Sequence, residues 1–260
     1  MGRLAQLELV VTFGDNRLSI RNSSPHHMYQ LIAQTEQFIV ISKDPGVSVH
    51  RDQSDKGLVM QLEQELGIKL WLVHRLDRIT SGVMLLATSA EACNQLAELF
   101  RQRRVEKYYI ALSDRKPNKK QGRVIGDMLK GRRGGWRLAR TRENPAITEF
   151  YSRSAGEGGR LLLCRPSTGQ THQIRVAMKS VGAPIIGDPL YHEHMEPAPD
   201  RGYLHAWQLS FELAGRAYHY VAEPDRGQLF RLESVREALA AWDPASMRWH
   251  EAGSRDTPAV

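Results

Sequence analysis

The stretch that decides how this chain folds reads His74-Arg75-Leu76-Asp77-Arg78-Ile79-Thr80-Ser81-Gly82. It places one carboxylate between two guanidinium groups, and it lies between the apolar runs 70–73 and 83–87. This pattern predicts a reactive side chain presented at the end of a strand. Arg75 and Asp77 stand two residues apart, so an extended backbone sends both side chains to the same side.

The charges around Asp77 suggest a role for it. An aspartate among arginines is expected to be ionised at neutral pH, which suits a nucleophile better than a general acid. A simpler interpretation stays open on these residues alone. Asp77 would then hydrogen-bond the backbone of its own turn, and the arginines would be solvated.

The net charge of the chain points to a polyanionic partner. Its 260 residues include 36 Lys and Arg against 29 Asp and Glu, a formal net charge of +7, while a hydrophobic fraction of 41% is ordinary. No apolar run approaches the roughly 18 to 20 residues of a membrane span, and no signal pattern opens the chain, so we expect a cytoplasmic protein. Cys93 and Cys164 are expected to be core or free thiols.

The chain is predicted to form one main domain with two flanking segments. Residues 1–27 should be an N-terminal extension with a candidate strand at 7–13, and 28–242 the main domain. The polar segment 243–260 should be a C-terminal tail, loose from Ala245 onward. No repeat or long linker divides the main domain, so we predict an α+β fold with one mixed sheet and helices around it.

Hydrophobic periodicity gives the expected elements. Strands are predicted at 38–41, 83–87, 108–112, 147–151, 160–165, 204–211 and 217–222. Four helices are predicted: one containing Leu58, Leu62 and Leu66, with Ser54 as its cap and Gly67 as its stop; one after the capping-box sequence 88–91; one capped by Thr171; and one over 232–242.

The segment 115–142 is the main source of the positive charge. It holds eleven Lys and Arg against the single acid Asp127, and its glycines and prolines are expected to break up any long element. A charge run is commonly a solvated face. Because this one also carries Trp136, contact with a flat polyanion over an aromatic platform is the alternative that we favour.

A second polar cluster covers 168–175 and is followed by the sequence 187–191. His172 and Arg175 are three residues apart, so in a helix they share a face near its first turn. The backbone donors of a helix start and these cations together could bind a carboxylate or a phosphate.

Four motifs in this order resemble the RNA pseudouridine synthases of the RluA type. They are His74-Arg75-Leu76-Asp77 with Thr80-Ser81-Gly82, Lys107-x-Tyr109, Gly169-x-Thr171-His172-Gln173-Ile174-Arg175, and Gly187-Asp188-x-Leu190-Tyr191. The similarity covers roughly 28–211. It implies the pseudouridine synthase catalytic fold, with a mainly antiparallel central sheet, and an enzyme that isomerises uridine in structured RNA without a cofactor or a metal.

The resemblance also implies roles for individual residues. Asp77 matches the catalytic aspartate, whether it attacks the sugar or helps to remove a sugar proton. Arg175 matches the arginine that pairs with it, and Tyr109 matches the tyrosine that stacks on the target base. Arg75 matches the residue that takes the place of the flipped base.

RNA contacts are expected from two parts of the chain. His74, Lys107 and His172 lie within the motifs. The basic segment adds Arg132, Arg133, Trp136 and Arg137. Residues 1–27 are too few for the S4 module that many relatives carry, so RNA recognition should fall to the catalytic domain.

Two departures from the family pattern concern RNA affinity and substrate choice. The usual Lys-Pro-x-Gly is Lys43-Asp44-Pro45-Gly46 here, and Gln170 stands where an arginine is common. The expected partner is a stem-loop of ribosomal or transfer RNA, bound by a monomer. Which RNA is modified stays open.

Two other classes of protein are alternatives. A non-catalytic RNA-binding protein would share the charge and the aromatic residues, although it has no need for an aspartate among arginines. A metal-dependent hydrolase could use His192, His194, His205 and His219. His192 and His194 lie just before Glu196, Pro197 and Pro199, which mark a loop, and surface histidines are the commoner outcome there.

Overall fold

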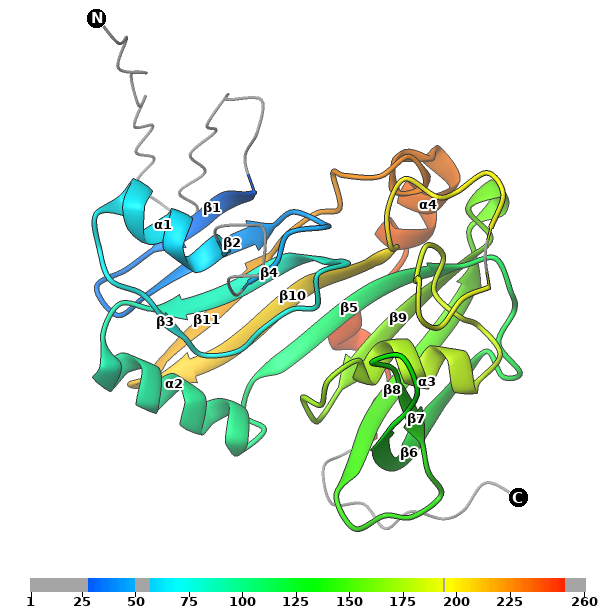
Figure 1. Ribbon diagram of the computed structural model, residues 1–260, viewed down its shortest axis with the longest axis horizontal. Helices are drawn as coiled ribbons and strands as arrows, with labels where there is room; N and C mark the ends of the chain where they lie inside the picture. Colours follow the sequence, from blue (N-terminus) through cyan, green and yellow to red (C-terminus); the bar gives the residue numbers. More distant parts are fainter. Residues whose placement is uncertain (1–27, 50–56, 194, 251–260) are drawn as a thin grey trace, which may run out of the picture.

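Eleven strands in the described part of the chain join into one sheet, with helices packed against it (Figure 1). The computed structural model describes residues 28–49, 57–193 and 195–250. The strands are β1 (Tyr29–Gln34), β2 (Phe38–Lys43), β3 (Trp71–Leu72), β4 (Thr80–Ala87), β5 (Glu106–Ser113), β6 (Gln121–Lys130), β7 (Trp136–Leu138), β8 (Pro145–Ser154), β9 (Arg160–Pro166), β10 (Leu204–Leu213) and β11 (Arg216–Val221). The α-helices are α1 (Leu58–Leu66), α2 (Ala90–Arg101), α3 (Gln173–Ser180) and α4 (Glu233–Ala240), and the short 3-10 helices are η1 (Gly156–Gly158), η2 (Leu229–Arg231) and η3 (Pro244–Ser246). Within these residues, no helix has both the length and the apolar character that crossing a membrane requires.

Nearly all neighbouring strands run antiparallel. The order across the sheet is β1-β2-β4-β10-β5-β9-β8-β6-β7, with β11 paired to β10 and β3 paired to β4. The exception is the parallel pair of β4 and β10, in which 204–206 lie beside 80–82. The predicted mixed, mainly antiparallel sheet with surrounding helices is therefore confirmed.

Strand β4 is buried along its whole length because helices cover both of its faces. Its residues Met84 and Leu86 pack in one core cluster with Leu62 of α1. The residues that alternate with them pack in a second cluster with Leu96 of α2. Successive side chains of a strand point to opposite faces, so α1 and α2 lie on opposite sides of the sheet. This two-sided burial explains why the run 83–87 is apolar without alternation.

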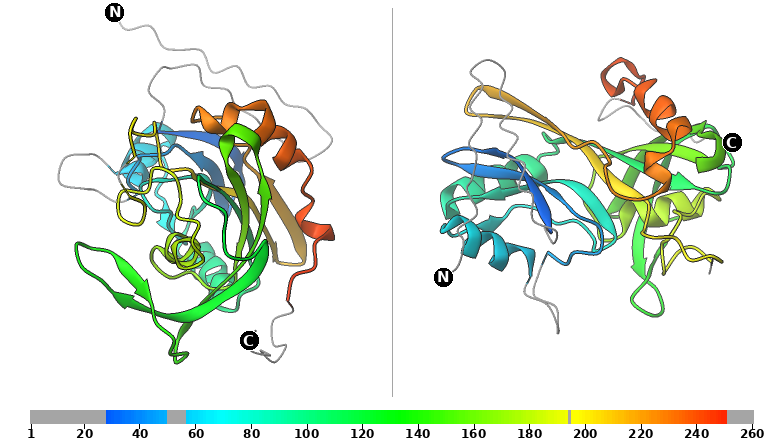
Figure 2. Two further views of the ribbon diagram at one scale, coloured as in Figure 1. Left: turned by 90° about the vertical axis from the view of Figure 1, so that its right-hand side faces the viewer. Right: turned by 90° about the horizontal axis from the view of Figure 1, so that it is seen from above.

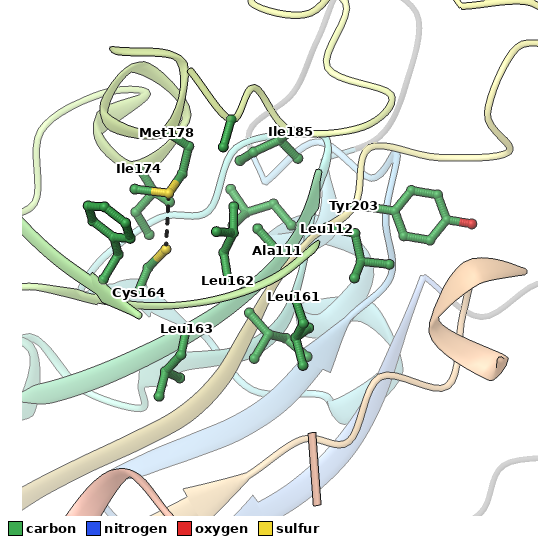
Figure 3. Packing of buried hydrophobic residues seen from close by; sticks show 14 of the residues in the cluster. Ala111, Leu112, Leu161, Leu162, Leu163, Cys164, Ile174, Met178, Ile185 and Tyr203 are labelled. Atoms are coloured by element: carbon green, nitrogen blue, oxygen red, sulfur yellow. Dashed lines mark hydrogen bonds between the residues drawn. The ribbon is translucent and has the colours of Figure 1, made fainter. Parts of the chain in front are cut away.

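Helix α3 packs against the second half of the sheet. Its residues Ile174 and Met178 lie over Leu162 and Cys164 of β9 (Figure 3), and the sulfur atoms of Cys164 and Met178 are 3.7 Å apart. Helix α4 lies on the other side of these strands (Figure 2, left). The packing of α3 fixes the start of this helix near the centre of the sheet.

The basic segment 115–142 forms the hairpin of β6 and β7, called the arm below, with a turn at 131–135. Strand β6 pairs first with β8 and then with β7. The expectation that glycines and prolines prevent a long element here is wrong, because Gly122 and Gly126 lie inside the ten residues of β6. Only glycine fits at position 126, because a Cβ atom there would lie 2.1 Å from the carbonyl oxygen of Ala139.

The start of α2 differs by one residue from the capping-box prediction. Ser89 is the cap, and its hydroxyl accepts a hydrogen bond from the backbone N–H of Ala92 at 3.1 Å. The hydroxyl of Thr88 donates instead to the carbonyl oxygen of Glu36. The capping sequence therefore predicts the helix correctly. Because the hydroxyl of Thr88 bonds to the turn at Glu36, the hydroxyl of Ser89 caps the helix.

Some expectations on the ends of elements are confirmed and others lie outside the described residues. Gly67 ends α1 in the left-handed conformation, with a φ of 67°, as predicted. The predicted cap Ser54, the strand at 7–13 and the extension 1–27 fall outside the described residues. The domain boundaries stay predictions.

The segment 245–250 is not loose as expected. The guanidinium of Arg165 lies 4.8 Å from the ring centroid of Trp249. The backbone N–H of His250 donates to the buried carboxylate of Glu149 at 2.8 Å. An indole ring and a carboxylate thus hold this segment against β8 and β9.

Gly82 lies in the parallel pair of β4 and β10 and leaves no room for a side chain. Its φ is +104°, and a Cβ atom would lie 2.1 Å from the carbonyl oxygen of Ala206. We expect Gly82→Ala to lower the free energy of unfolding by at least about 3 kcal/mol in urea denaturation, because a forced separation of the strands adds to backbone strain. Gly46→Ala is the control, since its φ is +80° and nothing lies within 4 Å. Equal losses in the two variants would contradict the prediction.

Candidate active site

A cleft lies at the middle of the sheet, where β4, β10 and β5 are neighbours. The loop before β4 brings Asp77 to the cleft from one half of the sheet, and α3 brings Arg175 from the other half. Tyr109 comes from β5, where it pairs with Ala206 of β10. The residues lining the cleft are Arg75, Leu76, Asp77, Thr80, Lys107, Tyr109, Pro166, Thr168, Gly169, Gln170, His172, Gln173, Ile174, Arg175 and Leu204.

Arg175 joins two aspartates. Its Nε and Nη2 atoms donate to Oδ2 and Oδ1 of Asp188 at 2.7 and 2.8 Å, and its Nη1 atom donates to Oδ2 of Asp77 at 3.1 Å. The side chain of Asp188 is fully buried and also accepts a bond from the backbone N–H of Leu190 at 3.0 Å. The side chain of Asp77 is 18% exposed. The two hydrogen bonds to Asp188 therefore fix the plane of the Arg175 guanidinium on its buried side. The carboxylate of Asp77 bonds to the other side and faces the cleft.

A buried amine holds the turn against which the Asp77 loop rests. Lys43, the last residue of β2, donates from Nζ to the carbonyl oxygens of Asp44 and Val47, both at 2.9 Å. The side chain of Arg78, next to Asp77, donates to another carbonyl oxygen of this turn at 2.9 Å. Burial is the main cause that lowers the pKa of Lys43 to about 7. The altered family motif 43–46 thus positions the loop through backbone oxygens.

Two residues of β5 face the cleft. Lys107 and Tyr109 stand two apart, so both side chains lie on one face of the strand. Burial, and then the charge of Asp77, raises the pKa of Tyr109 well above its usual range, so the phenol stays protonated. Burial lowers the pKa of Lys107 to about 8, and its Nζ lies 3.4 Å from the carbonyl oxygen of Thr168. The cleft therefore offers an aromatic ring and a cation beside the aspartate.

Arg75 is exposed and lines the same cleft as Asp77, as their spacing predicts. His74 turns elsewhere. Its Nε2 accepts a hydrogen bond from the backbone N–H of Leu85 at 3.0 Å, and its ring stacks on Phe100 with centroids 4.8 Å apart. Burial lowers the pKa of His74 to about 3, so this imidazole is neutral. The structure thus gives His74 a bracing position against β4, and the RNA contact expected for it stays a prediction.

His172 lines the cleft, but it lies outside α3. The expected cap Thr171 would have placed His172 in the first turn. The helix begins instead at Gln173, and His172 precedes it in the left-handed conformation with a φ of 58°. Its Nδ1 atom lies 2.8 Å from Oη of Tyr191. Burial, and then the charge of Arg175, lowers the pKa of His172.

Gln173 is a positioning residue that the sequence analysis missed. Its side chain is buried, and Oε1 accepts bonds from the hydroxyl of Thr168 at 2.7 Å and the backbone N–H of Gln170 at 3.0 Å. Its Nε2 donates to the carbonyl oxygen of Ile147 at 2.9 Å. These bonds hold the loop at the edge of the cleft against β8. The motif pointed to this segment, but only the burial of Gln173 identifies its function.

Strand β7 of the arm lies beside α3, and none of the arm's basic residues lines the cleft. Arg132 and Arg133 are exposed in the turn, and Arg137 is exposed on β7. Trp136 is half-buried and packs in a core cluster with Val176 of α3. This ring therefore attaches the arm to the helix, and its expected use as an aromatic platform for RNA stays a prediction.

The histidines that suggested a metal site have other contacts. His205 is buried and lies 2.7 Å from the hydroxyl of Ser81. His219 lies 2.7 Å from the hydroxyl of Ser210, and His194 is outside the described residues. Among the residues that the structure describes, no three His, Cys, Asp or Glu side chains group together as metal ligands. These contacts give no support to a metal-dependent hydrolase.

Comparison with known proteins identifies the class. A model of the RNA pseudouridylate synthase family matches residues 37–180, more than half of the chain. The chain is 45% identical over 214 residues to a Haemophilus influenzae protein named as an uncharacterized RNA pseudouridine synthase, and the match covers 82% of this chain and 95% of that protein. It is 30% identical to ribosomal large subunit pseudouridine synthase C of the same organism, over 80% of this chain and 69% of that one.

A solved structure agrees with this class. Human RNA pseudouridylate synthase domain containing 4 superposes with a TM-score of 0.64 at 27% identity, over 79% of this chain and 92% of that chain. The fold and the matches together define an isomerase that acts on uridine in RNA. This chain belongs to the RNA pseudouridylate synthase family, and the predicted resemblance is confirmed at that level.

Asp188 is expected to be the anchor of Arg175. Asp188→Asn keeps the shape of the side chain but removes the charge that compensates a buried guanidinium, so we expect the free energy of unfolding to fall by about 2 to 4 kcal/mol in urea denaturation. Asp225→Asn is the control, because this side chain is 64% exposed and its Oδ2 atom lies 3.9 Å from Nε of Arg226. Its loss should stay below about 0.5 kcal/mol. Similar losses in the two variants would argue against an anchor.

Proposed function

We propose that this pseudouridine synthase modifies a uridine in a stem-loop of ribosomal or transfer RNA, with Asp77 as the reacting group. The observation that carries the proposal is the hydrogen bond between Asp77 and the anchored Arg175 at the centre of the cleft. In the isomerisation, the bond between N1 and C1′ breaks, and a bond between C5 and C1′ forms. All atoms of the nucleoside are kept, apart from an exchange of protons.

Electrostatics support this role for Asp77. Detaching uracil develops negative charge on the base and positive character on the sugar, so a fixed anion beneath the ribose stabilises the transition state. The guanidinium of Arg175 donates a hydrogen bond to Oδ2 of this carboxylate at 3.1 Å. Attack of Asp77 on C1′ and removal of a sugar proton by Asp77 both use a carboxylate, and both routes stay open.

Tyr109 and Arg75 are proposed to handle the flipped base. A uridine within a stem must leave the base stack before it can reach Asp77, at a cost of a few kcal/mol. The ring of Tyr109 lines the cleft and can stack on the uracil. Arg75 is exposed at the cleft and can occupy the space that the base leaves in the RNA.

The proposed RNA target is supported by the names of relatives and not by a contact in the structure. One relative at 30% identity is named for the large ribosomal subunit, which favours ribosomal RNA, and transfer RNA stays the second candidate. We propose that the enzyme acts as a monomer in the cytoplasm, where both RNAs are found. Mapping pseudouridines in total RNA from cells with and without the gene would identify the target.

Asp77→Ala and Asp77→Asn are expected to abolish pseudouridine formation, with a rate loss of more than about 10⁴-fold, because the reacting carboxylate is removed. Chromatography of digested nucleosides measures the product. Urea denaturation of each variant shows whether it is folded. A folded Asp77→Ala protein with the wild-type rate would contradict the mechanism, whereas a wild-type protein that binds RNA and forms no pseudouridine would favour RNA binding without catalysis.

Replacing Arg132, Arg133 and Arg137 together with glutamine is expected to weaken RNA binding. If all three contact phosphates, the slope of log affinity against log salt concentration should fall by about 2 to 3, because fewer counterions are released. Filter binding of total ribosomal and transfer RNA at several salt concentrations measures the slope.

The control for the arm is a second triple variant with the same loss of charge. Arg216, Arg231 and Arg236 are exposed and lie on β11, on η2 and on α4. Their replacement with glutamine should leave most of the salt slope intact. If both triple variants lower the slope equally, net charge and not the arm explains the effect.

A further inference from the structure

The hydroxyl of Tyr191 lies in a chain of hydrogen bonds whose direction can be assigned. The backbone N–H of Trp136 donates to Oη of Tyr191 at 2.7 Å, and the same oxygen lies 2.8 Å from Nδ1 of His172. A backbone amide can only donate, so the hydroxyl accepts that bond. Among the described residues, Nδ1 is the one hydrogen-bond partner that can take the hydroxyl's own hydrogen. With Nδ1 as the acceptor, a neutral imidazole carries its proton on Nε2.

The surroundings of His172 favour this neutral form. Burial is the largest effect that lowers its pKa, and the charge of Arg175 is the next. Arg75 acts in the same direction, while the carboxylates of Asp77 and Asp188 oppose it. The balance favours a neutral ring, which offers one N–H group and does not form an ion pair with the reacting carboxylate.

The N–H group of this ring is available to a ligand in the cleft. His172 lines the cleft together with Asp77 and Tyr109. Within the described residues, Nδ1 has its partner in Tyr191, and Nε2 has no hydrogen-bond acceptor. The backbone of His172 adopts a φ of 58°, a conformation that is uncommon for residues with a side chain and is concentrated at functional sites.

We propose that His172 is a further catalytic residue, whose Nε2–H donates a hydrogen bond to a carbonyl oxygen of the flipped uracil. This inference rests on the proposed function of the cleft. When the bond between N1 and C1′ breaks, its electron pair stays with uracil and spreads onto the carbonyl oxygens. A neutral donor fixed at that point stabilises the charge in the transition state more than in the bound uridine.

The proton balance leaves His172 unchanged. After C5 has joined C1′, the proton on C5 is lost to solvent and N1 gains one, so the product is an isomer of the substrate. His172 keeps its proton on Nε2 throughout and acts by hydrogen bonding alone. A pre-oriented neutral imidazole is suited to this task, because protonation would pair it with Asp77.

Two substitutions of His172 distinguish hydrogen-bond donation by Nε2 from a purely structural role of this residue. The amide of asparagine ends about where the imidazole has Nδ1, and the longer amide of glutamine reaches about as far as Nε2. His172→Asn can thus keep the bond to Tyr191 and loses the donor in the cleft, while His172→Gln keeps the donor. Asparagine also tolerates the left-handed conformation better. A structural role therefore predicts that the asparagine variant is the more active of the two.

The measurement uses RNA labelled with tritium at C5 of uracil, isolated from cells that lack the gene. Release of tritium to water is followed with enzyme in excess, so the saturating rate is separated from the enzyme concentration at half-saturation. We expect His172→Asn to lower the saturating rate by about 10- to 100-fold, as for loss of a hydrogen bond to a charged group. His172→Gln should be at least about tenfold faster than His172→Asn.

The outcomes distinguish this inference from the proposed function. No release by the wild-type protein would contradict the function itself. Release by the wild type, with His172→Asn as fast as or faster than His172→Gln, would overturn only the role of His172. Urea denaturation of both variants confirms that the rates compare folded proteins.

Discussion

The cleft depends on one buried guanidinium that two carboxylates share. A buried charge is costly unless it is paired and hydrogen-bonded, and Asp188 meets that requirement from a fully buried position. This pairing fixes the plane of the Arg175 guanidinium from the side of α3. The remaining Nη1 atom then reaches across the sheet to Asp77, 98 residues earlier in the chain. The site is therefore built at the junction of the two halves, and both must be folded for it to exist.

Local chemistry was sufficient to predict much of the fold and part of the site. The apolar run of β4, the stop at Gly67 and the strands of the central sheet follow from periodicity and turn residues. The shared side of Arg75 and Asp77 follows from the alternation of an extended backbone. The partnership of Asp77 with Arg175 required the family resemblance, because no spacing rule relates residues so far apart.

What the sequence did not predict depends on distant contacts. Gln173 bonds to the backbone of β8, and Lys43 bonds to carbonyl oxygens of the turn after β2, and a polar residue type does not reveal either contact. His74 stands three residues before Asp77 in sequence, yet its ring turns to the backbone of Leu85. The segment 245–250 has a polar composition, and its one signal of attachment was Trp249, whose indole packs on a guanidinium.

The anchoring of Arg175 makes the two oxygens of Asp77 chemically inequivalent. Oδ2 accepts the bond from Nη1, while Oδ1 has no hydrogen-bond partner among the described residues. The lone pairs of Oδ1 therefore stay available to a ligand in the cleft. On either proposed route, the carboxylate is desymmetrised before the substrate arrives, so that one oxygen reacts with the ribose while the other keeps its orientation.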